Sequence, residues 1–252
     1  RVGNDGNDNF FEGSIAEIIV YDWAVSPVEH ILINNYLSSK YDIALSSNDK
    51  YTGDTLTAGD FDLDVAGIGV EGDSTNNMAM SGGLVLIDRF FFSNGGEFFI
   101  AGHNKESNTL TVTNLPSNVL VAVEREWMIS KISSSLNSSP EVRIGFFFDE
   151  LGFSYNQMNS SFYVLLKRSG GTGPFDIIDD GGPYCPGEEC GVFFNVNTLN
   201  LNTGDTITIG CLVDFSMIFN ESSTSSRHSL FSDTAIDLTN TSFTIEFWAS
   251  RF

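Results

Sequence analysis

Basic side chains are scarce in this sequence, where 12 Lys and Arg stand against 33 Asp and Glu and leave a formal net charge of -21. So large a negative excess repels phosphate groups, and it argues against nucleic acid and anionic membrane as partners. Long apolar runs are also missing, since none approaches the ~18 residues that a transmembrane helix needs, and no signal peptide is recognisable. We therefore expect a soluble, self-repelling surface suited to extracellular surroundings, without membrane insertion.

Phenylalanine is abundant by contrast, with 22 residues. Short segments of strand-like composition follow one another between turn signals such as NGG at 94–96 and SGGTGP at 169–174. This succession, without helical periodicity between the segments, predicts an all-β chain of antiparallel, jelly-roll-like β-sandwiches. The expected strands cover residues 61–68, 83–92, 97–102, 109–112, 119–129, 142–148, 161–166, 191–195 and 205–212.

One segment near the start has a different pattern. Residues 14–21 suggest a buried strand, and residues 27–40 predict the single short helix of the chain. Ser26 suits the N-cap, Pro27 suits the first helical position, and Glu29 completes a capping box. The apolar side of this helix would hold Val28, Ile31, Leu32 and Tyr36, and the other side Asn34, Asn35 and Ser38.

Residues 11–43 read FEGSIAEIIVYDWAVSPVEHILINNYLSSKYDI. This segment resembles the closing part of laminin-G-like (concanavalin A-like) jelly-roll domains in large secreted bacterial surface proteins. Asp42 stands where that pattern usually has Gly. The resemblance implies that residues 1–45 are the C-terminal end of such a domain. The matching residues are Gly13, Ile15, Ala16, Glu17, Ile19, Val20, Tyr21, Ser26, Glu29, Ile33, Tyr36, Leu37, Lys40, Tyr41 and Ile43.

Two further resemblances follow along the chain. Five runs occur in the order DVAGIG, EFFIAGHNK, EREWMISK, VRIGFFFD and FYVLLKRS. This order resembles a β-sandwich module of unknown role, which we expect at residues 46–213. Such modules follow laminin-G-like domains in giant surface proteins of gliding and other type 9-secreting bacteria. In this chain Val70 stands where the module usually has a basic residue. FTIEFW at 243–248 resembles an early strand of another laminin-G-like domain, expected at residues 214–252. We therefore expect a fragment of a longer protein, located extracellularly at the cell surface.

Calcium is the one cofactor that the sequence suggests. Four acidic residues occupy positions 1, 3, 5 and 12 of an EF-hand loop, but position 6, which needs Gly, is Val65. Apolar residues alternate with the acids, as in a half-buried strand whose carboxylates simply face water. Laminin-G-like domains also imply a rim site, for which Asn4, Asp5, Asn7 and Asp8 lie in a suitable loop. The four candidate metal ligands are Asp60, Asp62, Asp64 and Glu71.

A pair of carboxylates raises the question of catalysis. Glu124 and Glu126 would share one face of the expected strand 119–129, as a glycosidase pair requires. Laminarinase-type enzymes of the concanavalin A-like class use E-x-D-x-x-E, which is absent, so a solvated strand face is the better interpretation. The sequence also has no G-x-S-x-G elbow and no supported Cys–His arrangement. We expect no enzyme activity in this chain.

The cysteines and the Asp-Ser/Thr triplets suggest covalent modification. Cys185 and Cys190 bracket PGEE, and without a second pair or nearby histidines a disulfide is favoured over a metal site. Cys211 lies in an expected strand as a small hydrophobic residue. Secreted proteins of the bacterial group named above carry O-glycans on D-[ST]-[AILVMT] triplets, although turn chemistry alone enriches such pairs. The matching acceptor residues are Thr55, Ser74, Thr206 and Thr234.

These features support two hypotheses of function. The first is a non-enzymatic structural or adhesive segment of a long, gliding-motility-type adhesin, whose middle domain is a spacer between lectin-like sandwiches. The second is a carbohydrate-binding accessory region of a secreted glycan-active enzyme, which would need exposed aromatic side chains on a concave face. The expected partners are the neighbouring domains of the same chain, together with carbohydrate or cell-surface ligands.

Overall fold

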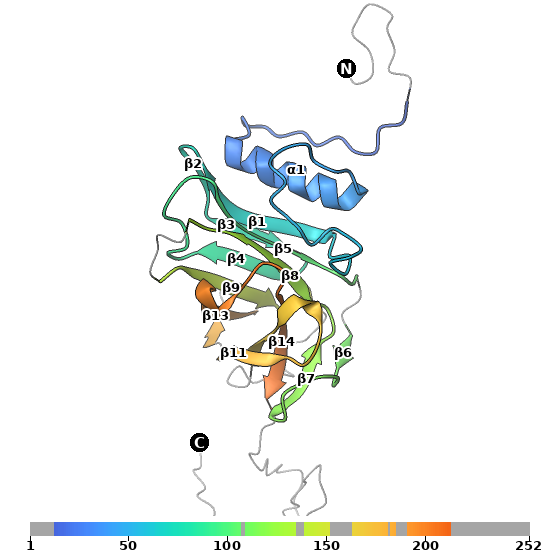
Figure 1. Ribbon diagram of the computed structural model, residues 1–252, viewed down its shortest axis with the longest axis vertical. Helices are drawn as coiled ribbons and strands as arrows, with labels where there is room; N and C mark the ends of the chain where they lie inside the picture. The colour runs from blue at the N-terminus through green and yellow to red at the C-terminus, as the bar shows by residue number, and fades with distance from the viewer. Residues whose placement is uncertain are drawn as a thin grey trace, which may run out of the picture. The chain divides into compact units, whose positions relative to one another are not determined.

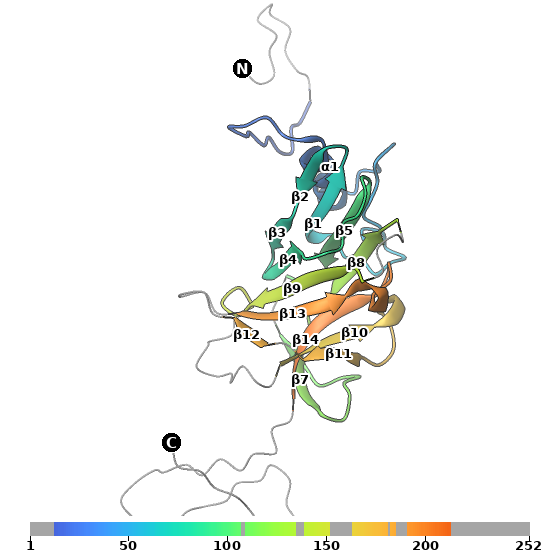
Figure 2. The same cartoon turned by 90° about the vertical axis from the view of Figure 1, so that its left-hand side faces the viewer.

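The computed structural model describes residues 13–106, 109–134, 139–151, 163–180, 182–184 and 191–212. Figures 1 and 2 show two antiparallel sheets and one α-helix, α1, which lies against strand β1. The described residues up to 212 form one compact unit. The expected domain bounds stay predictions. The all-β antiparallel sandwich with one helix, predicted from the sequence, is confirmed.

The larger sheet has nine strands in the order β11-β10-β14-β8-β5-β1-β2, with β7 paired to β14 and β6 paired to β7. Every pairing in it is antiparallel, as expected of strands joined by short turns. Its strands are β1 (Leu63–Glu71), β2 (Ser74–Asn76), β5 (Glu97–His103), β6 (Leu110–Thr111), β7 (Val119–Val123), β8 (Trp127–Ile132), β10 (Tyr163–Arg168), β11 (Asp176–Asp180) and β14 (Thr206–Leu212).

The smaller sheet has five strands in the order β12-β13-β9-β4-β3. The chain passes from one sheet to the other at Asn77, between β2 and β3. Two short 3₁₀ helices, η3 (Ser169–Gly171) and η4 (Thr198–Asn200), follow β10 and β13. The strands are β3 (Met78–Ser81), β4 (Leu84–Asp88), β9 (Glu141–Phe147), β12 (Gly182–Tyr184) and β13 (Gly191–Asn197).

The larger sheet is buried on both of its faces at β5. Phe99 and Ala101 belong to the main core between the two sheets, whereas Phe98 and Ile100 belong to a second core beneath α1. Successive side chains of a strand point to opposite faces, so a strand covered on both sides has no polar alternation. All seven residues of β5 are accordingly buried.

The helix α1 (Pro27–Tyr41) begins as the sequence predicts. Ser26 accepts a hydrogen bond from the Glu29 amide, and the Glu29 carboxylate accepts one from the Ser26 amide at 2.8 Å, which completes the capping box. Val28 and Ile31 pack into the second core. The Val28 amide also donates to the Ser74 hydroxyl at 3.2 Å, and this bond ties the helix N-terminus to β2.

The expected division of α1 into an apolar and a polar side is wrong at Asn35. Its side chain is buried and does not point away from the protein. Burial of this polar amide is possible because all its donors and acceptors are used. The amide nitrogen donates to the carbonyls of Ile31 and Asn48, and the amide oxygen accepts from the backbone of Lys50 and Tyr51. Asn35 therefore fixes the connector between α1 and β1 against the helix.

The expected buried strand at residues 14–21 is wrong. This segment has no regular secondary structure, and residues 13–20 are all exposed. A strand is stable only when a neighbour completes its ladder, and no described strand pairs with this segment. The sequence also missed four short strands, β2, β3, β11 and β12, and it joined β7 and β8 into one.

The residue that ends α1 gives a first test. Asp42 adopts the left-handed conformation at φ 51°, where Gly is favoured because it has no Cβ, and its carboxylate lies at the negative end of the helix dipole. We predict that Asp42→Gly raises the free energy of unfolding by about 0.5–1 kcal/mol, measured by urea denaturation. Asp42→Ala is the control, since it removes the same charge but keeps the Cβ. Equal stabilisation by both variants would contradict the backbone explanation.

Glu97, at the start of β5, gives a second test. Burial raises the pKa of this carboxyl, but hydrogen bonds from the Ser134 hydroxyl and from the amides of Ser93, Asn94 and Ser134 outweigh burial and lower the pKa to about 2. Because the folded-state pKa is depressed, the stability from Glu97 is present above the unfolded pKa of about 4.5 and is lost as the pH falls towards 2.

We expect Glu97→Gln to reduce the free energy of unfolding at pH 7 by about 2–3 kcal/mol, because one amide oxygen cannot accept all these bonds. The difference between the parent chain and the variant should shrink as the pH falls below about 4.5. Chemical denaturation at several pH values measures it. A difference that stays constant down to pH 3 would show that the Glu97 charge is not the source of the stability.

Candidate functional site

The densest group of buried charged side chains surrounds an irregularity between β7 and β8. Both strands pair with β14: Ala122 of β7 lies opposite Gly210, and Trp127 of β8 lies opposite Ile207. Four residues (123–126) lie between Ala122 and Trp127, but only two (208–209) lie between their partners on β14. The two additional residues form a bulge. The Thr208 hydroxyl closes it by contacting the carbonyls of Val123 and Arg125, each at 2.8 Å. Bulges redirect side chains, and this one sends three consecutive charged residues in different directions.

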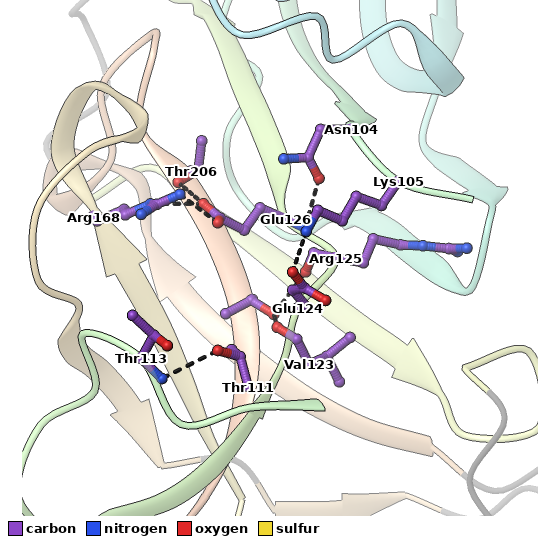
Figure 3. Close-up of polar contacts among 11 residues, drawn as sticks. Asn104, Lys105, Thr111, Thr113, Val123, Glu124, Arg125, Glu126, Arg168 and Thr206 are labelled. Atoms are coloured by element: carbon purple, nitrogen blue, oxygen red, sulfur yellow. Dashed lines mark hydrogen bonds and ion pairs between the residues drawn. The ribbon is translucent and has the colours of Figure 1, made fainter. Parts of the chain in front are cut away.

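Glu126 points into the protein and is 7% exposed. Figure 3 shows Arg168 from β10 and Thr206 from β14 directed towards its carboxylate. The Arg168 guanidinium donates through two nitrogens, with Nε at 2.7 Å, and the Thr206 hydroxyl donates at 2.7 Å. This planar, two-bond arrangement is among the stronger ion-pair geometries, and here it joins three strands of the larger sheet.

The two residues before Glu126 have different surroundings. Arg125 is 5% exposed, lies over the Trp127 ring, and donates to the carbonyls of Gly82 at 2.9 Å and Glu106 at 2.5 Å. Glu124 is partly exposed and binds Lys105 and Thr109 at the surface. The hydrogen bonds from Lys105 and Thr109 lower the pKa of the Glu124 carboxyl.

Glu124 and Glu126 therefore do not form the carboxylate pair that one continuous strand would present. They lie in the bulge, and their carboxylates bind different partners, at the surface and in the interior (Figure 3). The expected solvated strand face is also wrong for Glu126, because the bulge turns its carboxylate towards Arg168. The sequence did not reveal this pairing, since Arg168 and Thr206 are 42 and 80 residues away from Glu126.

The four candidate metal ligands do not come together. Asp60 is exposed just after a turn, Asp62 is half-buried, and Glu71 ends β1. Since an extended strand rises about 3.3 Å per residue, Glu71 lies roughly 23 Å along the chain from Asp64. The described residues contain no group of three side chains of metal-binding type. Asn4, Asp5, Asn7 and Asp8, the candidate rim loop, are outside the described residues.

Asp64 instead contacts His103, a pairing that the sequence did not indicate. The His103 Nε2 atom lies 2.8 Å from Asp64 Oδ2, and the ring is 1% exposed beside Trp127. Burial lowers the pKa of His103, while the Asp64 carboxylate opposes that shift. A Cβ on Gly82 would lie less than 3 Å from both partners, so only Gly fits over this pair.

The candidate modification sites lie in different environments. Thr55 is exposed in a loop, whereas the Ser74 hydroxyl donates to the Glu71 carbonyl at 2.7 Å and accepts from the helix N-terminus. Thr206 is fully buried, so the folded domain does not present its hydroxyl. Cys211 is half-buried on β14. Thr234 and the expected Cys185–Cys190 disulfide lie outside the described residues.

A groove of about 380 Å³ lies beside α1. Apolar and aromatic side chains predominate in its lining, and Tyr21 and Trp23 form an edge-to-face pair at its rim with ring centroids 5.2 Å apart. We call this the β1–β3 groove. It is lined by Tyr21, Trp23, Val25, Glu29, Leu32, Ile33, Tyr36, Val65, Ala66, Gly67, Asn76, Met78, Ala79, Met80 and Ser81.

Comparison with known proteins found nothing similar: no family model, no curated protein and no solved structure matches this chain. Within the part of the chain that the structure describes, no helix has the length and apolar character needed to cross a membrane.

The two glutamates of the bulge provide a matched pair of variants. We predict that Glu126→Gln lowers the free energy of unfolding by about 3 kcal/mol, because the half-buried Arg168 guanidinium loses its counterion. Glu124→Gln should cost far less than Glu126→Gln, since Glu124 and its partners are exposed to solvent. Thermal and urea denaturation of both variants measure the difference. Similar losses for the two would contradict the assignment of Glu126 as the structural carboxylate.

Proposed function

We propose that this chain is a non-enzymatic segment of a long cell-surface adhesin, in which the described sandwich is a spacer between lectin-like domains. Its partners are the neighbouring domains of the same chain and, through them, carbohydrate or other surface ligands. The proposal places the chain outside the cell, where a strongly acidic surface keeps neighbouring copies apart and in solution.

The observation that carries the proposal is the use of buried charge. Each buried charged side chain among the described residues binds another part of the same domain. A general acid or base must reach a substrate proton, whereas buried charged groups that bind other parts of the same domain hold its strands in register. The residues concerned are Glu97, His103, Arg125, Glu126 and Asp205.

A replacement experiment in the parent protein tests the spacer role. Cells would carry the parent with the whole described unit, residues 13–212, deleted, or with that unit replaced by an unrelated β-sandwich of similar length. For a spacer, deletion should weaken adhesion to surfaces and replacement should restore it, because only length and rigidity matter.

If the replacement fails while the native region restores adhesion, this region holds a specific binding site and the spacer proposal is wrong. Incubation of the purified chain with a panel of polysaccharides is the second arm. Release of reducing sugar that Glu126→Gln abolishes, without loss of folding, would overturn the non-enzymatic part of the proposal.

A further inference from the structure

The outward face of the smaller sheet is largely apolar. Leu86, Ile144 and Phe194 belong to the main core, so the residues that alternate with them on β4, β9 and β13 face outward. Antiparallel sheets commonly present polar side chains on such a face. We call the outward positions of the four adjacent strands (Figure 2) the β3–β13 face. They are Met78, Met80, Val85 (buried), Ile87, Glu141, Arg143, Gly145, Phe147, Gly191, Phe193, Asn195 and Asn197.

Two aromatic rings of this face lie over glycines. Phe193 is opposite Gly145, and Phe147 is opposite Gly191, on the paired strands β13 and β9. A Cβ on Gly145 would lie 2.5 Å from the Phe193 ring, and one on Gly191 would lie 3.0 Å from the Phe147 ring. The two rings contact each other edge to face, with centroids 6.1 Å apart. Because each ring covers the glycine opposite, the face has little relief, and a second flat sheet can approach it.

Solvent reaches much of this apolar surface. Met78 is 63% exposed and Met80 is 59% exposed, while Ile87, Phe147 and Phe193 are half-buried. Methionine side chains adapt to the shape of a partner, and contiguous apolar surface marks interaction sites in soluble proteins. The β3–β13 face therefore has the character of an interface.

The charges of the β3–β13 face are balanced and self-complementary. Its outward positions hold one acidic and one basic side chain, Glu141 and Arg143, in a chain of net charge -21. Arg89, from the loop after β4, binds Glu141 at 3.6 Å, and Arg143 Nε donates to Asn195 at 2.8 Å. A second copy of the chain brings the same two opposite charges. A two-fold contact can therefore place Arg143 of each copy beside Glu141 of the other.

The apolar part of the face suits another sheet better than a saccharide. Met80, Val85, Gly145 and Phe193 form one continuous row across the four strands, and the polar side chains gather at one end of the face. A saccharide needs polar partners along its length. Two apolar sheet faces, by contrast, pack about 10 Å apart with interdigitating side chains.

The size of the face sets the expected strength of the contact. Strands about 4.8 Å apart and about six residues long, at about 3.4 Å per residue, give the face roughly 400 Å² in projection with its side chains. Stable protein pairs bury about 800 Å² on each partner, and weak pairs bury less than about 600 Å². The face therefore suits a weak, reversible contact, with a Kd of about 10 µM to 1 mM.

We propose that two copies of this chain form a dimer in which their β3–β13 faces pack against each other around a two-fold axis. Each copy covers the exposed methionine and phenylalanine side chains of the other, and the two-fold contact closes at two copies. Two chains of charge -21 repel each other, so association should strengthen as salt rises. The inference does not depend on the proposed function.

Sedimentation equilibrium from about 1 µM to about 1 mM chain provides the measurement. The expected mass rises from 27.6 kDa towards twice that value, at lower concentration in high salt. Met80→Lys on β3 and Phe193→Ala on β13 should each weaken association at least about tenfold, because the first places a charge in the contact and the second removes an aromatic side chain from it. Leu199→Lys adds the same charge on η4, at a residue that is 61% exposed, and should have no such effect. Circular dichroism checks that each variant folds.

Three results would overturn the proposal. The first is a single 27.6 kDa species at every salt and chain concentration. The second is a dimer that Met80→Lys leaves unchanged, since Met80 is exposed and its replacement does not disturb the core. The third is a monomer that binds a soluble polysaccharide and loses this binding in Met80→Lys, which would assign the face to a saccharide.

Discussion

The ion pair between Glu126 and Arg168 is the interaction on which the larger sheet depends most. Glu126 leaves the bulge between β7 and β8, Arg168 ends β10, and Thr206 begins β14, so one carboxylate holds three strands together. Without it the bulge would place an unpaired carboxylate or guanidinium in a largely dry interior, which costs several kcal/mol. The pair lies where β7 stops and β8 begins, at the point where their register against β14 changes.

Similar polar bonds fix other irregular segments of the domain. Glu97 accepts hydrogen bonds from the amides of Ser93, Asn94 and Ser134. Asn35 accepts hydrogen bonds from the connector that follows α1. Each case joins a loop to a strand or helix through a buried side chain that is satisfied by backbone groups. The sandwich core supplies most of the hydrophobic stabilisation, while these few polar side chains specify the path of the chain between the strands.

The acidic charge of this protein is unevenly distributed along the chain. A charge of -21 keeps copies of the chain apart over distances up to about 8 Å at physiological salt. No charged residue occurs between Asp73 and Asp88, and residues Met78 to Ser81 of this stretch line the β1–β3 groove. Repulsion between copies is therefore weaker at this uncharged stretch.

Local sequence patterns determined the features of this protein that depend on neighbours in the chain. The capping box predicts the start of α1, and turn residues between apolar segments predict an antiparallel all-β fold, because both signals act over a few residues. Long-range contacts decided the rest. Burial of Glu126 required Arg168 from another strand, and burial of Asn35 required the backbone of Lys50 and Tyr51. Residues 14–21 have the composition of a strand but no ladder, because strand formation depends on a partner that local sequence does not specify.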